Sequence, residues 1–234
     1  MTDLSAFPIT ARWPAKHSDR LQLYSLNTPN GVKASIMLEE TGIAYEPHLV
    51  DIGKNESHTP EFLSLNPNGK IPAIIDPDGP DGKPLGLFES GAILLYLADK
   101  TGKFIPKDAA ARWHTIQWVF FQMAAIGPIF GQVGFFHKFA GKAIADKRPL
   151  ERYVTESRRL LEVLDTQLES RAWMMGDAYT IADIATLGWV RNIITFYEAR
   201  DLVKYDTLKN VPAWLDKALA RPAVKRGLAI PSRD

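Results

Sequence analysis

Residues Asn66 to Lys100 read NPNGKIPAIIDPDGPDGKPLGLFESGAILLYLADK, which contains two short apolar runs, a turn and the start of a helix. Lys70 to Ile75 is rich in β-formers, Asp76 to Lys83 is dense in Pro, Gly and Asp, and Leu85 to Phe88 is apolar again. This order predicts a β-hairpin. From Glu89 onward the apolar residues fall on one helical face, which predicts a helix directly after the hairpin.

Two features of this hairpin suit a ligand that is a small peptide carrying carboxylates. Pro72 cannot donate to a strand ladder, so it belongs at a strand start or edge. A cis bond between Ile71 and Pro72 would leave the Ile71 backbone facing outward, where an extended peptide can pair with it. Glu89 and Ser90 lie where a helix leaves its N–H groups unpaired, and such an end attracts a carboxylate. The residues alone also fit an ordinary hairpin and helix without a ligand.

The run NPNGKIPAI, followed by LFESGAILLYLA, resembles the glutathione-binding half of the glutathione transferase family. The resemblance implies that Ile71, in the loop that holds Pro72, pairs with the cysteinyl backbone of glutathione. It implies that Glu89 and Ser90 bind the γ-glutamyl end. It also implies that Lys70 faces the glycyl carboxylate.

Composition limits the chemistry that this chain can perform. The 234 residues are 46% hydrophobic with a net charge of +1, which fits one large or two small domains and gives no general attraction to nucleic acid. The absence of Cys excludes disulfides and a cysteine nucleophile, so any thiol must arrive with the ligand. The five His residues are scattered, and we expect no metal site. With no secretory signal and no apolar run near the roughly 18 residues of a membrane span, we expect a cytoplasmic protein.

The order of predicted elements indicates two domains. After an extended arm over residues 1–20, residues 21–101 predict the order β-α-β-α-β-β-α. A strand joined to the next through a helix favours parallel pairing, and the closing hairpin is antiparallel, which is the thioredoxin-like arrangement. Residues 102–109 predict a linker. The strand pattern then stops, and residues 110–234 predict an all-helical domain, so the fold class is α/β followed by all-α.

The clearest local signal in the second half is the run Tyr179-Thr180-Ile181-Ala182-Asp183. Thr180 and Asp183 have the spacing of a capping box, with Asp in place of Glu. Such an N-cap contributes roughly 1 kcal/mol to stability. The run also matches a buried capping motif in the helical domain of the resembled family, so we expect it to serve stability rather than chemistry.

A glutathione enzyme must stabilise a thiolate, and the free thiol has a pKa of about 8.5. The loop after the first predicted strand faces the Pro72 edge and offers Ser25, Thr28 and Asn30 as hydrogen-bond donors. We favour Thr28 and Asn30, because the strand-to-helix turn can direct a hydroxyl and an amide at one sulfur. Ser25 remains the alternative. Composition alone favours a simpler interpretation, in which Thr28 and Asn30 only cap the helix and shape the turn.

The run Thr28-Pro29-Asn30-Gly31 resembles the nu-class bacterial glutathione transferases and their fungal relatives. That resemblance implies a homodimer with glutathione-dependent disulfide reductase or peroxidase activity. It implies a site that holds one or two glutathione molecules or the glutathione disulfide. The alternatives are a transferase that conjugates electrophiles and a non-catalytic glutathione-binding regulator. The intact set of Pro72, Glu89 and Ser90 favours an enzyme.

Further candidates flank these motifs. Lys54 and His58 are placed to close over the glycyl end or to reach a second glutathione, although a solvated loop explains them equally well. Arg152 resembles an Arg that closes on the ligand in nu-type proteins, and an exposed helix Arg is the alternative. Gln132 and Phe136 are expected on the acceptor side.

Aromatic residues in the second half have two expected uses. Trp113, Phe120 and Phe130 are candidates either for the acceptor side or for the contact with a second subunit. Aromatic side chains at such spacing are nevertheless more often part of a core than of a site.

Overall fold

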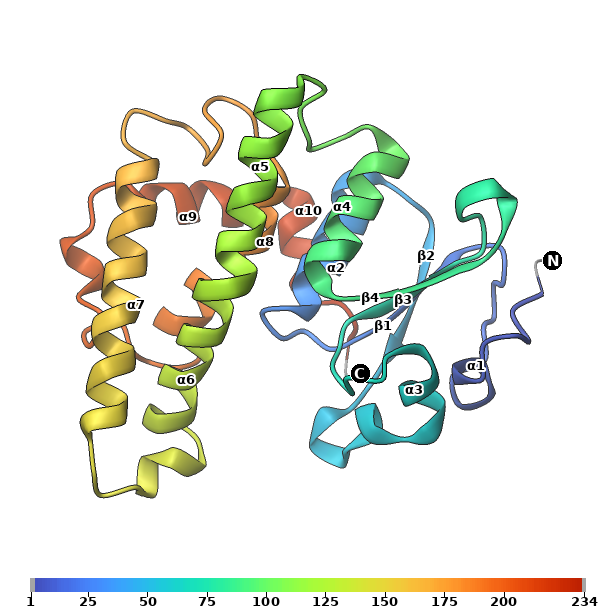
Figure 1. The fold of residues 1–234 in the computed structure, drawn as a ribbon, viewed down its shortest axis with the longest axis horizontal. Coiled ribbons are helices and arrows are strands. Elements are labelled where there is room, and N and C mark those ends of the chain that lie inside the picture. The colour runs from blue at the N-terminus through green and yellow to red at the C-terminus, as the bar shows by residue number, and fades with distance from the viewer. Residues whose placement is uncertain (1–2, 233–234) are drawn as a thin grey trace. The chain divides into compact units, whose positions relative to one another are not determined.

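The computed structural model describes residues 3–232 and divides into two compact units (Figure 1). The first unit contains the chain up to Thr101 together with the segment from Pro222 onward, and the second contains Gly102–Arg221. The first unit has a four-stranded sheet covered by helices, and the second is built from helices and loops. This confirms the predicted fold class, a thioredoxin-like α/β domain followed by a helical domain.

The sheet of the first unit has the strand order β2-β1-β3-β4. The strands are β1 (Leu21–Ser25), β2 (Tyr45–Leu49), β3 (Ala73–Asp76) and β4 (Leu85–Phe88). β1 and β2 are parallel because a helix connects them, whereas β3 pairs antiparallel with both β1 and β4. The predicted hairpin is therefore β3–β4, and its first residue lies opposite both Tyr24 and Phe88.

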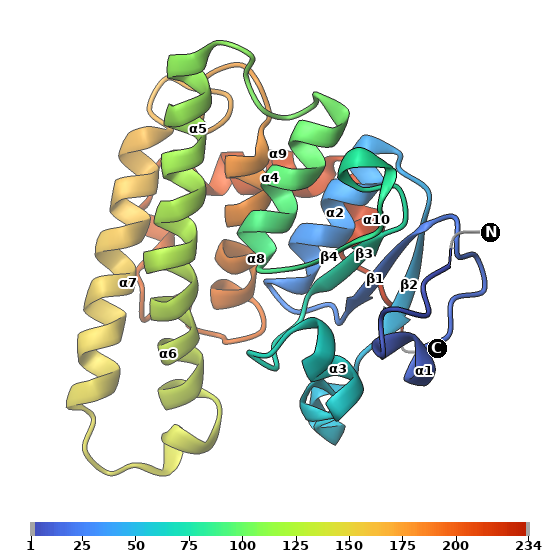
Figure 2. The same ribbon diagram turned by 45° about the vertical axis from the view of Figure 1, so that its right-hand side comes forward.

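Helices cover both faces of this sheet (Figure 2). They are α1 (Ile9–Arg12), α2 (Gly31–Thr41), α3 (Pro60–Leu65), α4 (Ser90–Thr101) and α10 (Pro222–Gly227). Short 3-10 helices lie at Ile52–Lys54, Glu56–His58 and Pro80–Gly82. α2 and α4 pack side by side on one face, and α1 packs against α3 on the other. The starts of α2 and α4, which bear on the site, therefore belong to the same layer.

The arm before β1 was expected to be extended, but it contains α1 and contributes to the core of the first unit. Leu4 and Ile9 are buried in that core. Trp13 Nε1 donates to the backbone oxygen of Leu49 at 2.9 Å, and the Glu46 carboxylate accepts two backbone N–H groups of the arm at 3.0 and 2.8 Å. This helix could not be predicted from the sequence, because four residues are too few to show a helical period.

The C-terminal segment returns to the first unit, although we expected residues 110–234 to form one helical domain. α10 packs on α2, where Ser35 Oγ donates to the backbone oxygen of Gly227 at 2.6 Å. A Cβ at Gly227 would lie 2.6 Å from the Cα of Ile36, so only a glycine permits this approach. The segment carries no strand pattern, and nothing local in the sequence distinguishes it from the helices before it.

The second unit is an assembly of five α-helices. They are α5 (Ala109–Phe121), α6 (Gly127–His137), α7 (Arg148–Gln167), α8 (Ile181–Ile194) and α9 (Val211–Ala220). Short 3-10 helices lie at Ala140–Ala143 and Tyr205–Thr207. α7 runs beside α6, and α8 packs against α5, α6 and α9 (Figure 1). Almost every residue of α8 is buried, so α8 is the central helix of this unit.

α5 and α6 form one continuous helix because a π-helical turn, Gln122–Ile126, joins them. The joined helix Ala109–His137 has 29 residues and is apolar enough, by length and composition only, to cross a membrane. We expected no apolar run near the length of a membrane span. In the structure one side of this helix packs against α7 and α8, and 39% of its most apolar stretch is buried.

The predicted capping box is present at the start of α8. Asp183 Oδ2 accepts from the Thr180 N–H at 3.0 Å. Asp183 Oδ1 accepts from the Met174 N–H and from Trp214 Nε1, both at 2.9 Å. Burial of this carboxyl raises the pKa of Asp183, while the hydrogen bonds oppose that shift. Asp183 thus joins the start of α8 to the loop before it and to α9.

Candidate functional site

A small pocket of about 130 Å³ opens in the first unit at the place where the sequence predicts the ligand. It is formed by the start of α2, the loop before β3 and the start of α4. Its lining residues are Asn30, Asn66, Asn68, Lys70, Ile71, Pro72, Glu89 and Ser90. Six of these eight are predicted site residues, and Asn66 and Asn68 are additions from the structure.

The loop before β3 is held in shape by the Asn66 side chain. Asn66 Nδ2 donates to the backbone oxygen of Lys70 at 2.5 Å, and Asn66 Oδ1 accepts the backbone N–H of Asn68 at 3.0 Å. Asn66 is buried, whereas Lys70 and Asn68 are exposed at the pocket. Asn66 belongs to the Asn-Pro-Asn-Gly run but was not among the predicted site residues. The signal was available, because Asn side chains commonly close a turn on the backbone two residues on.

The peptide bond between Ile71 and Pro72 is cis. The ladders of β3 begin at Ala73, so the backbone of Ile71 lies outside them. The Ile71 side chain is buried in the core of the first unit, beside residues of the N-terminal arm. The side chain thus anchors the loop on one side, and the residue lines the pocket on the other.

Glu89 directly precedes α4 and Ser90 is its first residue, and both line the pocket. Glu89 has a φ of +72°, a left-handed conformation that costs a non-glycine residue of order 1–3 kcal/mol. Its backbone oxygen accepts the N–H of Ile93 at 2.9 Å, and its side chain is exposed. Ser90 is buried. Strained backbone of this kind clusters at ligand-binding sites, where the surrounding fold maintains it.

Lys33 lies behind Ser90 and was not predicted as a site residue. Its Nζ donates to Ser90 Oγ at 3.2 Å, and the side chain is fully buried in α2. Burial lowers the pKa of Lys33 to about 7, and the negative charge of Glu89 opposes that shift. A signal existed in the sequence, because Lys33 interrupts an otherwise apolar and small run at the start of α2.

The turn before α2 places the three candidate sulfur ligands differently. Asn30 lines the pocket, but Thr28 and Ser25 do not. Thr28 Oγ1 accepts the N–H of Gly31 at 3.2 Å and so helps to shape the turn before α2, whose N-cap is Asn30. Ser25 is buried, and its hydroxyl donates to the backbone oxygen of Leu26 at 3.3 Å. A Cβ at Gly31 would lie 1.8 Å from that oxygen, so the turn requires glycine there.

Lys54 and His58 do not line this pocket. Lys54 is exposed and lies 3.7 Å from an Asp51 carboxylate oxygen. His58 is exposed, its Nδ1 is 3.2 Å from Ser57 Oγ, and its ring lies against Gly69. His58 therefore neighbours the loop before β3, and Lys54 ends the exposed 3-10 helix Ile52–Lys54.

Three predicted residues belong to the second unit. Gln132 of α6 and Arg152 of α7 are exposed. Phe136 of α6 is half-buried and stacks on Tyr153 of α7, with ring centroids 5.8 Å apart and planes 17° apart. These residues thus lie on two neighbouring helices of that unit.

The three aromatic candidates for a surface role divide into two kinds. Trp113 and Phe120 are 67% and 61% exposed on α5. Phe130 is fully buried inside the second unit, so its prediction as a surface residue was wrong. The helical period alone does not identify the buried face of α6, because this helix is apolar on most sides.

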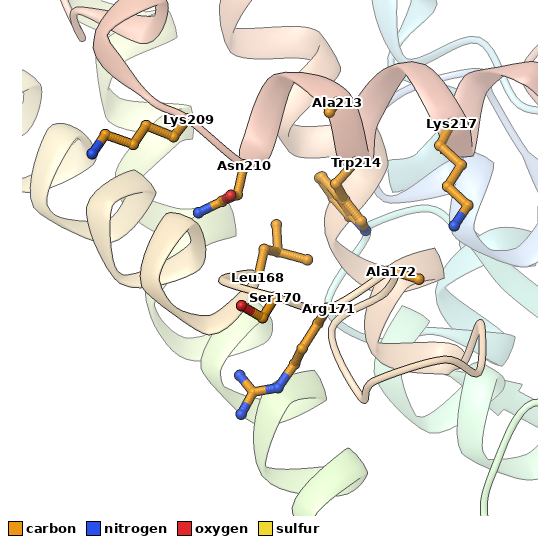
Figure 3. A pocket seen from close by; sticks show the side chains of 9 residues that line it. All are labelled: Leu168, Ser170, Arg171, Ala172, Lys209, Asn210, Ala213, Trp214 and Lys217. Atoms are coloured by element: carbon orange, nitrogen blue, oxygen red, sulfur yellow. The ribbon is translucent and has the colours of Figure 1, made fainter.

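Cavity size does not identify the site. A cavity of about 380 Å³ lies between the end of α7 and the start of α9 (Figure 3). Figure 3 shows that the side chains of Arg171 and Lys209 extend in different directions rather than toward one point. Asp165 already accepts the backbone N–H groups at the start of α9.

Within residues 3–232, no group of three His, Asp or Glu side chains is arranged to hold a metal ion.

Two family models match this chain. The glutathione S-transferase N-terminal domain matches residues 19–99, and the glutathione S-transferase C-terminal domain matches residues 128–222. Among curated proteins, the disulfide-bond oxidoreductase YfcG of Escherichia coli is 44% identical over 209 residues, which is 89% of this chain and 94% of that protein.

Solved structures are similar over the whole chain. A glutathione transferase of Burkholderia graminis, with two glutathione molecules bound per subunit, is 68% identical with a TM-score of 0.99 and covers 100% of this chain and 98% of its own. A glutathione transferase from Pseudomonas putida, with one glutathione disulfide bound per subunit, is 61% identical with a TM-score of 0.96. That match covers 98% of this chain and 100% of the other.

Proposed function

This chain belongs to the glutathione S-transferase family, and from that membership we propose that it binds glutathione in the pocket beside Pro72 and uses it to reduce disulfides. The observation that carries the proposal is the meeting of Asn30, Ile71 and Ser90 at one pocket in a chain without Cys. The preference for disulfides is supported by the name of the E. coli relative and by the glutathione disulfide in the P. putida structure.

The chemistry of the pocket matches the chemistry of the tripeptide. The backbone of Ile71, outside the ladder, is available to pair with the cysteinyl residue. The exposed Glu89 carboxylate suits the ammonium group of the γ-glutamyl end, and the start of α4 at Ser90 suits its carboxylate. Lys70 is exposed at the pocket and suits the glycyl carboxylate.

Asn30 and Thr28 are the proposed donors to the glutathione sulfur. The Asn30 amide lines the pocket. Thr28 Oγ1 accepts from Gly31 and retains its own hydrogen for donation. Hydrogen bonds to the thiolate lower its pKa, and each unit of that shift corresponds to about 1.4 kcal/mol. In this assignment Ser25, which bonds to Leu26, is not a sulfur ligand.

The proposed reaction has two thiol–disulfide exchange steps. The glutathione thiolate attacks one sulfur of the substrate disulfide, forms a mixed disulfide and releases the other sulfur as a thiolate. A second glutathione thiolate attacks the glutathione sulfur of that mixed disulfide. The products are glutathione disulfide and the second substrate thiolate. Two electrons thus pass from two glutathione molecules to the substrate, and the protein contributes no sulfur of its own.

The remaining assignments are proposals that rest on the family resemblance. They give Lys54 and His58 to the glycyl end or to a second glutathione, Arg152 to the ligand, and Gln132 and Phe136 to the acceptor. The same resemblance supports a cytoplasmic homodimer.

The test compares turnover of three acceptors with glutathione: hydroxyethyl disulfide, a hydroperoxide and an aryl halide. We expect the disulfide to be reduced fastest. Faster turnover of the aryl halide would contradict the proposed disulfide reduction and support a conjugating transferase. Binding of glutathione without turnover of any of the three would support a non-catalytic binding module instead.

A further inference from the structure

The buried amine of Lys33 has a place behind the pocket that packing does not explain. Its side chain is 0% exposed, yet its Nζ reaches Ser90 Oγ at 3.2 Å. A Lys is almost never fully buried, because moving an ammonium group out of water is costly. An apolar side chain of similar length, such as Met, would fill the same volume of α2 without that cost.

The direction of this hydrogen bond determines how Ser90 can act. In its protonated form Lys33 has only hydrogens to offer, so Ser90 Oγ is the acceptor in this hydrogen bond. The hydroxyl hydrogen of Ser90 therefore points away from Lys33. Ser90 lines the pocket and is the first residue of α4, so donation on that side serves an anion at the helix start.

Charge reinforces the same arrangement. Lys33 lies close enough to the exposed Glu89 for the two to interact electrostatically. Glu89 and Ser90 thus present a carboxylate and a hydroxyl next to each other at the pocket, with a cation behind them. A carboxylate and an ammonium group on one carbon atom, as at the γ-glutamyl end of glutathione, match that pair.

We infer that Lys33 is a positioning residue, which holds Ser90 as the hydrogen-bond donor to the α-carboxylate of the γ-glutamyl group and places a positive charge behind that contact. This inference rests on the proposed binding of glutathione. Lys33 does not touch the ligand and acts through Ser90.

The first experiment measures the Kd of glutathione for Lys33→Met by calorimetry. We expect binding about tenfold weaker than in the unaltered protein, which corresponds to about 1.4 kcal/mol. The matched control is Lys100→Met, which removes a lysine of the same unit that pairs with Asp76 at 2.9 Å and does not line this pocket. The control should bind glutathione as the unaltered protein does.

The second measurement separates positioning from general damage. A glutathione analogue with a 4-aminobutyryl group in place of the γ-glutamyl group lacks only the α-carboxylate. Lys33→Met should bind this analogue within about twofold of the unaltered protein, because the contact that Lys33 supports is missing from both complexes. Equal losses for glutathione and the analogue would overturn the inference.

A double-mutant cycle tests whether Lys33 acts through Ser90. Ser90→Ala should weaken glutathione binding, and adding Lys33→Met should weaken it little further, because the intermediary is already absent. Additive losses would overturn the inference.

Two further outcomes are informative. If Lys33→Met does not fold, Lys33→Gln, which keeps a donor without the charge, replaces it, and failure of both to fold would assign Lys33 to folding and overturn the inference. If the unaltered protein binds no glutathione, the proposed function itself fails. If it binds but Lys33→Met binds equally well, only the present inference fails.

Discussion

At the residue scale, the residues that line the pocket were predicted best where the signal lies in one residue's own backbone or exposed side chain. Ile71, Pro72 and Glu89 carry local signals, because a proline position and a helix start can be recognised without knowing the fold. Lys33 carries one local signal, a charge within an apolar run, but that signal does not identify its partner. Its proposed role depends on α2 and α4 lying side by side, and residues 33 and 90 are too far apart in sequence for any local pattern to connect them.

The proposed sulfur ligands give a direct prediction for turnover. Asn30→Ala and Thr28→Ala should each lower kcat about tenfold or more with a disulfide substrate, because a hydrogen bond to a charged group contributes about 1.5–3 kcal/mol. The Kd of glutathione should change less than threefold, since its other contacts remain. Steady-state kinetics and calorimetry measure the two effects. Ser25→Ala is the comparison variant, and a larger loss there would transfer the assignment to Ser25.

His48 gives a pH dependence of stability. It is buried against Tyr24, its Nε2 lies 2.7 Å from Gln22 Oε1, and burial lowers its pKa in spite of the opposing charge of Glu46. As the pH falls below about 6.5, His48 takes up a proton in the unfolded chain but stays neutral in the folded chain. Because the unfolded chain then binds more protons, stability is lost as the pH falls.

Thermal unfolding between about pH 7 and about pH 6 measures this dependence. The unaltered protein should lose Tm over that interval, and His48→Gln, which cannot be protonated, should lose less. Parallel Tm curves for the two proteins would show that His48 is not the responsible group.

At the scale of elements, regular strands and long helices were predictable, and short or returning ones were not. The β3–β4 hairpin carries turn signals and α8 carries a cap signal, and both elements are present. α1 has four residues and α10 has six, which is too short for a pattern. Their positions depend on tertiary contacts, such as that between Gly227 and Ile36, which no local sequence pattern records.

The start of α8 gives a prediction about stability alone. In the unaltered protein both carboxylate oxygens of Asp183 accept N–H groups. In Asp183→Asn one of these oxygens is replaced by an NH2 group, whose hydrogens face those donors. We therefore expect a loss of about 2–4 kcal/mol in the free energy of unfolding. Thr180→Ala should cost about 1 kcal/mol, the usual value of an N-cap. Urea unfolding measures both. Without urea, the folded Thr180→Ala protein should reduce its disulfide substrate at the rate of the unaltered protein. A lower rate would mean that this motif contributes to catalysis.

At the scale of the whole molecule, the predicted homodimer directs attention to α5. Trp113 and Phe120 are both strongly exposed there, although aromatic side chains of this size are usually covered in a folded protein. The residues next to a large aromatic side chain in the sequence do not show whether that side chain is buried, contacts water or contacts a second subunit. The sequence therefore could not distinguish the buried Phe130 from the exposed Trp113 and Phe120.

Phe120→Glu tests the assignment of α5 to a subunit contact. A charge there should favour the monomer by weakening association about tenfold or more, since an uncompensated charge is costly in an apolar interface. Light scattering over a dilution series measures the change in mass. Phe196→Glu is the matched control, because Phe196 is 52% exposed elsewhere in the same unit, and it should leave the mass unchanged. Equal effects of the two substitutions on the mass would show that α5 is not specifically part of the subunit contact.

The return of α10 to the first unit means that the polypeptide crosses between its two units twice, once after Thr101 and again before Pro222. A single protease cut in the segment between α4 and α5 would therefore not release two independent bodies. The C-terminal fragment would keep the helix that covers Ser35 and Ile36, and the fragments would stay associated through it. The N-terminal fragment made alone would expose that side of α2 to water.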